Sequence, residues 1–199
     1  MASGTTESSY PQKNDPLYFR YIVYKICPEF KVNDRNKAIL NNLYYYVHGD
    51  GPLDPKKGIY FYGDVGTGKS TMMKILAEYQ RLFGRGFMCM NATLLTAQFA
   101  TYGVEALNES TWNETHKGVE PVERGFDEFG RETMPAKHYG NELNVMQHVL
   151  QIRYELKVKT HITTNLTIDE IELRYGRHIF DRCIEMFNFI EVKGESFRE

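Results

Sequence analysis

The chain has 199 residues, of which 42% are hydrophobic and 25% are charged, and its formal net charge at pH 7 is −2. This length suits one α/β core with short additions, and the composition excludes both a disordered protein and one embedded in a membrane. The small net charge gives no general attraction to nucleic acid, so any contact with DNA requires a local cluster of Lys and Arg.

The first 16 residues, MASGTTESSYPQKNDP, predict a flexible leader. They are rich in Ser, Thr, Gly and Pro and lack the basic and apolar segments of a secretory signal. The chain also has three widely spaced cysteines, an odd number that suits a reducing compartment rather than a disulfide framework. We therefore expect a cytoplasmic protein with a leader over residues 1–16.

Residues 17–56 predict a helical extension that precedes the main domain. Its first part, residues 17–30, is a mixed apolar, aromatic and basic run. Aromatic stripes more often belong to a core than to an interface, which favours a segment packed on the flank of the domain over a docking segment. Asn33 and Asp34 can then cap a further helix, which Gly49 ends.

A glycine-rich motif, GDVGTGKST, occupies residues 63–71, directly after a strand-like run at 59–62 and directly before a helical pattern. A phosphate-binding loop needs this order of strand, turn and helix, because the turn and the first helical amides must face the phosphates. Lys69 supplies a positive charge to the same oxygens, and Ser70 is placed to hold Mg²⁺. The motif predicts a nucleotide site formed by Gly63, Asp64, Val65, Gly66, Thr67, Gly68, Lys69, Ser70 and Thr71.

Strands and helices alternate beyond this motif. We predict a strand over 87–91 and a helix over 92–102, from the apolar patterns of these residues. Residues 105–128 are rich in acidic groups. They indicate a surface loop up to about Pro121, followed by a strand that ends in Phe-Asp-Glu.

The remaining residues continue the alternation. We predict a long helix over 141–157, a strand over 160–164, helices over 169–175 and 178–186, and a closing strand over 187–192. Five strands interleaved with helices predict an α/β fold, a three-layer sandwich of the P-loop NTPase type around a parallel five-stranded sheet. Ligands are expected at the carboxyl ends of such strands.

Asp127 and Glu128 supply the carboxylate pair that nucleotide hydrolysis requires on a strand next to the phosphate-binding loop. In this interpretation Asp127 organises Mg²⁺ together with Ser70, and Glu128 polarises the attacking water as the general base. The alternative is a solvated acidic turn. The preceding run, residues 123–125, is unusually polar for a buried central strand, which normally reads as a continuous apolar run.

Polar residues in the last third of the chain complete the predicted site. Asn165 follows a strand and can reach the γ-phosphate or the attacking water, although it could instead cap the following helix. Arg174, Arg177 and Arg182 lie close together on the late helices. They are either solvated surface residues or include a finger that reaches the phosphate of a neighbouring subunit.

Taken together, the strings GDVGTGKST, FDEFGRE and HITTNLTIDEIELRYGRHIFDR resemble the AAA+ ATPases of the DnaC-type helicase loader and IstB-like group. The resemblance covers about residues 57–198, so residues 57–199 are the expected ATPase domain. It implies Walker A with Lys69 and Ser70, Walker B with Asp127 and Glu128, sensor 1 at Asn165 and an arginine finger at Arg182.

The resemblance also implies ATP or ADP and Mg²⁺ as ligands, a reduced or absent helical lid, and a homo-oligomer assembled through the ATP site. Members of the group contact single-stranded DNA while loading a replicative helicase, whereas IstB-like relatives serve a transposase. Function on this basis rests on analogy. One alternative is a nucleotide-gated adaptor with slow hydrolysis, which the polar run before Asp127 favours. Another is a small-molecule kinase, against which the ITTN and GRHIFDR strings argue.

Overall fold

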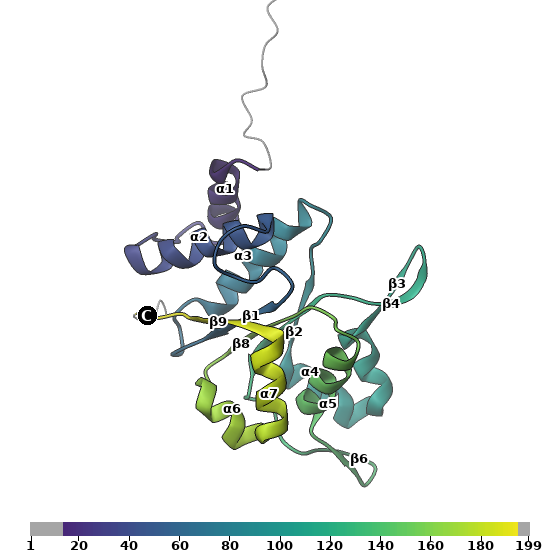
Figure 1. Cartoon of the computed structure of the whole chain (residues 1–199). Coiled ribbons are helices and arrows are strands. Elements are labelled where there is room, and N and C mark those ends of the chain that lie inside the picture. Colours follow the sequence, from purple (N-terminus) through teal and green to yellow (C-terminus); the bar gives the residue numbers. More distant parts are fainter. Residues whose placement is uncertain (1–13, 195–199) are drawn as a thin grey trace, which may run out of the picture.

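The computed structural model describes residues 14–194, and five parallel strands form its central sheet (Figure 1). In their order across the sheet, the strands are β2 (Met88–Asn91), β5 (Arg124–Phe129), β8 (Thr160–Thr164), β1 (Gly58–Tyr62) and β9 (Phe187–Glu191). This confirms the predicted α/β fold with a parallel five-stranded sheet. Residues 1–13 of the predicted leader lie outside the described residues, and Pro16, at the end of that leader, already begins the first helix.

Helices cover both faces of the sheet and give the three predicted layers (Figure 1). One face carries α1 (Pro16–Ile26), α2 (Asp34–His48) and α3 (Lys69–Arg81), and the other carries α4 (Ala92–Tyr102), α5 (Val145–Glu155), α6 (Ile168–Tyr175) and α7 (Arg177–Met186). Alternate residues of β1 serve the two cores, because Ile59 and Phe61 pack in the first and Tyr60 in the second. Within residues 14–194, none of the helices combines the length and hydropathy needed to cross a membrane.

The acidic segment between α4 and β5 is more ordered than the predicted surface loop. It contains a 3-10 helix, η1 (Gly103–Ser110), and an antiparallel hairpin of β3 (Trp112–Thr115) and β4 (Gly118–Pro121) that projects from the body of the protein (Figure 1). The predicted loop is therefore wrong in this region. The acidic composition correctly indicates exposure, but it carries no signal for the pairing of β3 with β4.

A second hairpin corrects the predicted start of the long helix. β6 (Ala136–His138) pairs with β7 (Asn141–Leu143), so α5 begins only at Val145 and not at residue 141. Tyr139 and Gly140 form the turn, with φ of 44° and 84°. Two successive residues of positive φ are the mark of a tight hairpin turn, and this local geometry outweighs the apolar periodicity that predicted a helix.

The polar residues at the start of β5 belong to a buried network, which explains how the run 123–125 enters a central strand. Arg124 Nε donates to the carbonyl oxygen of Glu109 over 3.0 Å. The fully buried Arg153 on α5 donates to the carbonyl oxygen of Ser110 over 2.7 Å. Because buried polar groups are tolerated where they are hydrogen-bonded, a polar strand is stable here. These contacts lie at the amino end of the sheet, away from the predicted carboxylate pair.

Glu123 and His161 form the charged part of this network. The Ile59 amide donates to His161 Nδ1 over 3.1 Å, so Nε2 carries the proton and donates to the Glu123 carboxylate over 2.7 Å. Burial lowers the pKa of His161. Burial alone would raise the pKa of Glu123, but the hydrogen bond from His161 and the nearby positive charge, including that of Lys159, together outweigh burial and hold that pKa below its ordinary value. The pair is therefore a neutral imidazole beside a carboxylate.

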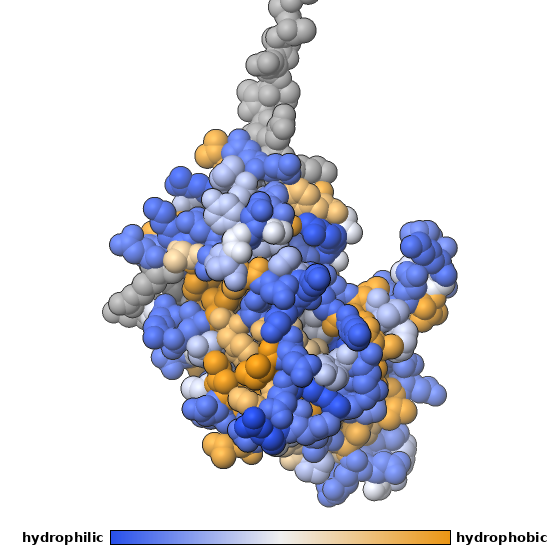
Figure 2. Space-filling model, viewed as in Figure 1, coloured by the Kyte–Doolittle hydropathy of each residue, from blue (hydrophilic) through white to orange (hydrophobic). Residues whose placement is uncertain are grey.

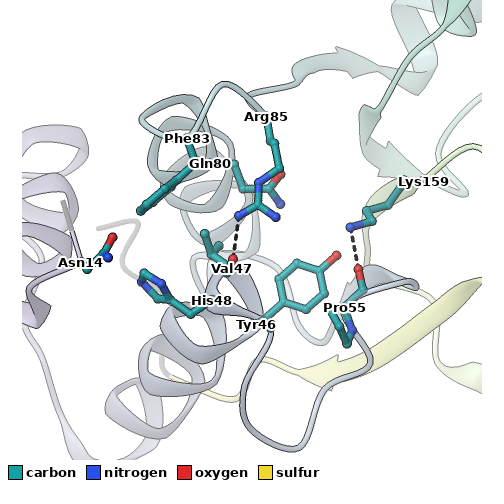
Figure 3. A pocket seen from close by; sticks show the side chains of 10 residues that line it. Asn14, Tyr46, Val47, His48, Pro55, Gln80, Phe83, Arg85 and Lys159 are labelled. Carbon is teal, nitrogen blue, oxygen red and sulfur yellow. Dashed lines mark hydrogen bonds between the residues drawn. The ribbon is translucent and has the colours of Figure 1, made fainter.

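The extension is packed on the core at the same end of the sheet. α1 buries Phe19, whose ring lies edge-on to that of Tyr79 on α3 at 4.7 Å between centroids, in agreement with the predicted packing on the flank. A cavity of about 320 Å³ lies where α2 ends and β8 begins (Figure 3). Its two cations bond to backbone carbonyl groups, Arg85 Nη2 to Val47 over 2.7 Å and Lys159 Nζ to Pro55 over 2.6 Å. These bonds fasten the extension to the core. The domain boundary at residue 57 stays a prediction.

Candidate nucleotide site

The glycine-rich loop follows β1 and leads into α3 at the carboxyl edge of the sheet. Gly66 and Gly68 have φ of 84° and 93°, the left-handed region in which glycine carries no steric cost. The N-cap of α3 is Gly68, which offers no side chain to cap the first helical amides, and this is compatible with an anion site. Lys69 is buried, and its Nζ donates to the carbonyl oxygens of Gly63 and Asp64 over 2.8 and 2.6 Å. The loop thus holds its lysine within the turn.

Ser70 and Asp127 meet across the gap between the loop and β5. Ser70 Oγ donates to Asp127 Oδ1 over 2.7 Å. Thr163 on β8 donates to the same carboxylate oxygen, and its own hydroxyl accepts the Glu128 amide over 3.2 Å. A hydroxyl and a carboxylate side by side are hard oxygen ligands of the kind Mg²⁺ takes in addition to nucleotide phosphates and water. Among residues 14–194, no group of three or more His, Cys, Asp or Glu side chains could hold a metal ion. A cation at Ser70 and Asp127 would therefore need nucleotide phosphates and water as further ligands.

Asp127 and Glu128 lie in a bulge of β5. The pairing of β5 with β8 shifts register between Phe126 and Phe129, and Glu128 has a φ of 60°. Bulges re-aim side chains at sheet edges and beside active sites, and a non-glycine residue of positive φ is a frequent mark of a functional site. In a regular strand, consecutive side chains point to opposite faces of the sheet. The bulge breaks this alternation, so both carboxylates can face the carboxyl edge of the sheet.

The Glu128 carboxylate is held at both oxygens. Arg131 Nη1 lies 2.6 Å from Oε1, and Asn91 Nδ2 donates to Oε2 over 3.0 Å. Asn91 is the last residue of β2, and its side-chain oxygen also caps α4 by accepting the Thr93 amide over 2.9 Å. This residue belongs to the site by position but is absent from the sequence prediction.

Asn165 lies where the sequence predicts, directly after β8 at the same edge as the loop. The alternative role for it, capping the next helix, is taken by Thr167. Thr167 accepts the Glu170 amide, and the Glu170 side chain in turn accepts the Thr167 amide, which completes a capping box at the start of α6. Asn165 is half-buried, and its position leaves it available to the nucleotide edge.

The three late arginines bond to residues of the late helices, of α5 and of the turn after β5. Arg174 Nη2 donates to the Glu132 carbonyl over 2.6 Å, and Arg177 Nε lies 2.9 Å from the Asp181 carboxylate. Arg182 on α7 contacts His178 Nε2 over 2.7 Å, and its guanidinium lies 4.9 Å from the centre of the Tyr154 ring. Among the described residues, these contacts join α6 to the turn after β5 and α7 to α5, and none of them reaches the glycine-rich loop.

No family model and no curated protein matches the sequence. By fold, the chain is similar to the DnaC helicase loader, with a TM-score of 0.61 and 16% identity over 84% of this chain and 96% of that one. It is also similar to DnaI, with a TM-score of 0.66 and 17% identity over 90% and 93% of the two chains. A third structure, a putative primosome component from Streptococcus pyogenes serotype M3, has a TM-score of 0.64 and 18% identity over 96% of this chain and 93% of that one. The chain shares its fold with these three proteins.

The same fold occurs in DnaA from Aquifex aeolicus bound to AMPPCP, with a TM-score of 0.56 and 14% identity. This chain spans about half of that DnaA chain, 49% of its length. At these identities the likeness establishes the fold alone. Within this fold, the glycine-rich loop, Asp127, Glu128 and Asn165 lie at the carboxyl edge of the sheet, as the sequence predicts.

Proposed function

We propose that this protein binds ATP with Mg²⁺, hydrolyses the nucleotide, and acts in DNA replication as a loader of a replicative helicase in the cytoplasm. The observation that carries the ATPase part is the contact of Ser70 with Asp127, beside a second carboxylate, Glu128, in a bulge. This arrangement brings a phosphate-binding loop, a metal-binding pair and a candidate base to one edge of an AAA+ sheet.

In this proposal each residue has a separate task. Lys69 and the amides of the loop bind the β- and γ-phosphates, and Ser70 and Asp127 hold the cation. Bound Mg²⁺ neutralises charge on the phosphate oxygens. Glu128 accepts the proton of the attacking water at its carboxylate, the water oxygen bonds to the γ-phosphorus, and the bond to the β-phosphate oxygen breaks. Asn165 orients the γ-phosphate or the water.

Assembly completes the site. Among the described residues, Arg182 contacts His178 on its own helix and Tyr154 on α5, away from the glycine-rich loop, so we assign its guanidinium to the phosphate of an adjacent subunit. The surface around it supports such a contact. Ile184 on the same helix is 42% exposed, and Figure 2 shows hydrophobic residues gathered over β9 and α7. Exposed apolar groups of this kind commonly mark interfaces between proteins.

Single-stranded DNA is the proposed nucleic acid partner. Tyr102 at the end of α4 and Tyr139 at the tip of the β6–β7 hairpin are 70% and 94% exposed. Tyr139 adjoins His138, whose Nδ1 lies 3.1 Å from the Ala100 carbonyl oxygen and so joins the hairpin to α4, the helix that ends at Tyr102. Exposed aromatic rings offer stacking platforms for unpaired bases. The replication initiator DnaA, which has been solved bound to AMPPCP and single-stranded DNA, is similar in fold to this chain, with a TM-score of 0.55 and 13% identity.

The loader role is tested by the anisotropy of a labelled single strand, titrated with the protein in the presence and absence of ATP and Mg²⁺. We expect ATP to strengthen binding. We also expect Tyr102→Ala and Tyr139→Ala each to weaken it by about 1 kcal/mol or more, with the exposed Tyr21→Ala on α1 as the control. Binding equal in all three variants would remove this surface from the proposal, and capture of a replicative helicase by the full chain would support the partner.

A second candidate is a nucleotide-gated adaptor with slow hydrolysis, which would serve a helicase or a transposase of the IstB-like kind. The feature that favours it is the engagement of both Glu128 oxygens, by Arg131 and Asn91. A base that must first leave two donors would react slowly. The polar run before Asp127 no longer favours this candidate, because its residues are satisfied at the other end of the sheet.

A further inference from the structure

Glu132 is a buried carboxylate that the proposed mechanism does not use. Its side chain is only 3% exposed, although it lies four residues after Glu128 in a turn at the protein edge. Its Oε2 accepts the Gly130 amide over 2.8 Å, and its Oε1 accepts a hydrogen bond from the Tyr175 hydroxyl. A buried carboxylate is costly unless it is hydrogen-bonded, and both oxygens here are satisfied.

Tyr175 is the other end of this contact and the last residue of α6. Its ring stacks on Phe129 at 4.6 Å between centroids and 18° between planes. Burial raises the pKa of Tyr175, so the hydroxyl stays protonated and donates. The next residue, Gly176, leads directly into α7, which carries Arg182.

The turn between Glu128 and Glu132 is closed by its own bond from the Arg131 amide to the Glu128 carbonyl over 3.1 Å, and it is also held from outside. Gly130 has a φ of 90°, and a Cβ there would lie 2.5 Å from Leu166 Cδ1, so the turn fits tightly against the segment after β8. A second bond reinforces the support, because Arg174 donates to the Glu132 backbone carbonyl over 2.6 Å. Side chain and backbone of one residue thus both bond to the end of α6.

We propose that Glu132 and Tyr175 are positioning residues that fix α6 and α7 to the turn bearing the candidate base. The inference rests on the proposed ATPase function and extends it. Through this contact, the position of Glu128 is coupled to the position of α7, whose Arg182 is proposed to reach the next subunit. Neither positioning residue touches the nucleotide.

The test uses isosteric variants of the full chain, Tyr175→Phe and Glu132→Gln. The first removes one hydroxyl and keeps the ring stacked on Phe129. The matched control is Tyr46→Phe, which removes the hydroxyl of another buried tyrosine, bonded to the Lys57 carbonyl over 2.7 Å at the opposite edge of the sheet.

We expect kcat to fall about tenfold in both positioning variants, with ATP affinity within about twofold of wild type, because small misplacements of reacting groups cost rate rather than binding. The double variant should be no slower than either single one, and Tyr175→Phe should add little to the larger loss in Arg182→Ala. Turnover in Tyr175→Phe equal to that of Tyr46→Phe would overturn the inference.

Hydrogen exchange separates this inference from the ATPase proposal. If wild type shows no turnover above Glu128→Gln, the ATPase proposal fails, but AMPPCP can still report on the contact. We expect AMPPCP to change amide exchange in residues 168–186 of wild type and of Tyr46→Phe, and this change to be lost in Tyr175→Phe. An equal change in Tyr175→Phe, or no change in wild type, would overturn the inference whether or not ATP is hydrolysed.

Discussion

Ser70 and Asp127 join the glycine-rich loop to the central strand through a hydrogen bond of 2.7 Å from hydroxyl to carboxylate. They are 57 residues apart in the sequence. β8 lies between β5 and β1 and pairs in parallel with both, so the loop after β1 and the carboxylate on β5 lie at one edge of the sheet. Thr163 on β8 also donates a hydrogen bond to the Asp127 carboxylate. The pair is thereby preset in the arrangement that a cation between phosphate and protein would use.

Asp127→Asn should remove the effect of Mg²⁺ on nucleotide binding. The amide keeps the shape of the side chain but lacks the charge that a divalent cation requires. We expect ATP affinity in Mg²⁺ to fall roughly tenfold or more, toward the value measured in EDTA. Titration calorimetry with and without Mg²⁺ measures the difference. A variant that keeps the full Mg²⁺ effect would show that Asp127 is not a metal ligand.

Glu128→Gln should preserve ATP binding and remove turnover, because an amide cannot accept the proton of water. We expect a fall in kcat of roughly a hundredfold or more, measured as phosphate release at saturating ATP. Glu142→Gln, a half-exposed carboxylate on β7, is the matched control and should keep normal turnover. Equal turnover in wild type and Glu128→Gln would assign the base to another group.

Arg182→Ala should leave the ATP affinity of the isolated subunit nearly unchanged and lower turnover only where subunits meet. A finger that acts on a neighbour contributes about 10³-fold in related NTPases. Arg177→Ala provides the control, since Arg177 lies on the same helix and its guanidinium pairs with Asp181. The assignment would be wrong if both variants lost the same activity, or if Arg182→Ala lost none at high protein concentration.

Stability should fall with acidification between about pH 6.5 and 5, because the pKa of His161 is lower in the folded than in the unfolded chain. Above the unfolded value, the imidazole is neutral in both states and the full stability is present. Below it, the unfolded chain takes up a proton that the folded chain resists, at a cost of up to about 1.4 kcal/mol per pH unit.

Urea denaturation across this range measures the effect of His161. His161→Gln should be less stable than wild type at neutral pH, because it breaks the contacts with Ile59 and Glu123, but its stability should change less between pH 6.5 and 5. An unchanged slope in the variant would place the titration on another histidine.

The local signals in the sequence located the loop and the sheet well. Strand, glycine turn and lysine stand next to one another in the chain, so the sequence alone shows their relation. Asn91 and Thr163 escaped prediction because their contacts with Glu128 and Asp127 join separate strands. Their signal is a polar residue at the end of a strand that neighbours the carboxylate strand. That signal becomes readable only once the order of strands is known.

Two inferences from the sequence failed, and for different physical reasons. The polar start of β5 seemed unfit for a central strand because its partners, including Arg153 and His161, lie on other elements. The helix predicted from residue 141 failed because a two-residue turn at Tyr139 and Gly140 outweighed an apolar pattern. The first error therefore came from contacts between distant elements, and the second from a local turn that the helical pattern did not reveal.

The most direct test of the proposed function is ATP turnover over a series of protein concentrations, with and without single-stranded DNA, with Glu128→Gln as the blank. We predict turnover above the blank that rises per subunit with protein concentration and rises further with DNA, because Arg182 must reach a neighbouring site. ATP binding without turnover above the blank would contradict an assembling ATPase and favour the nucleotide-gated adaptor.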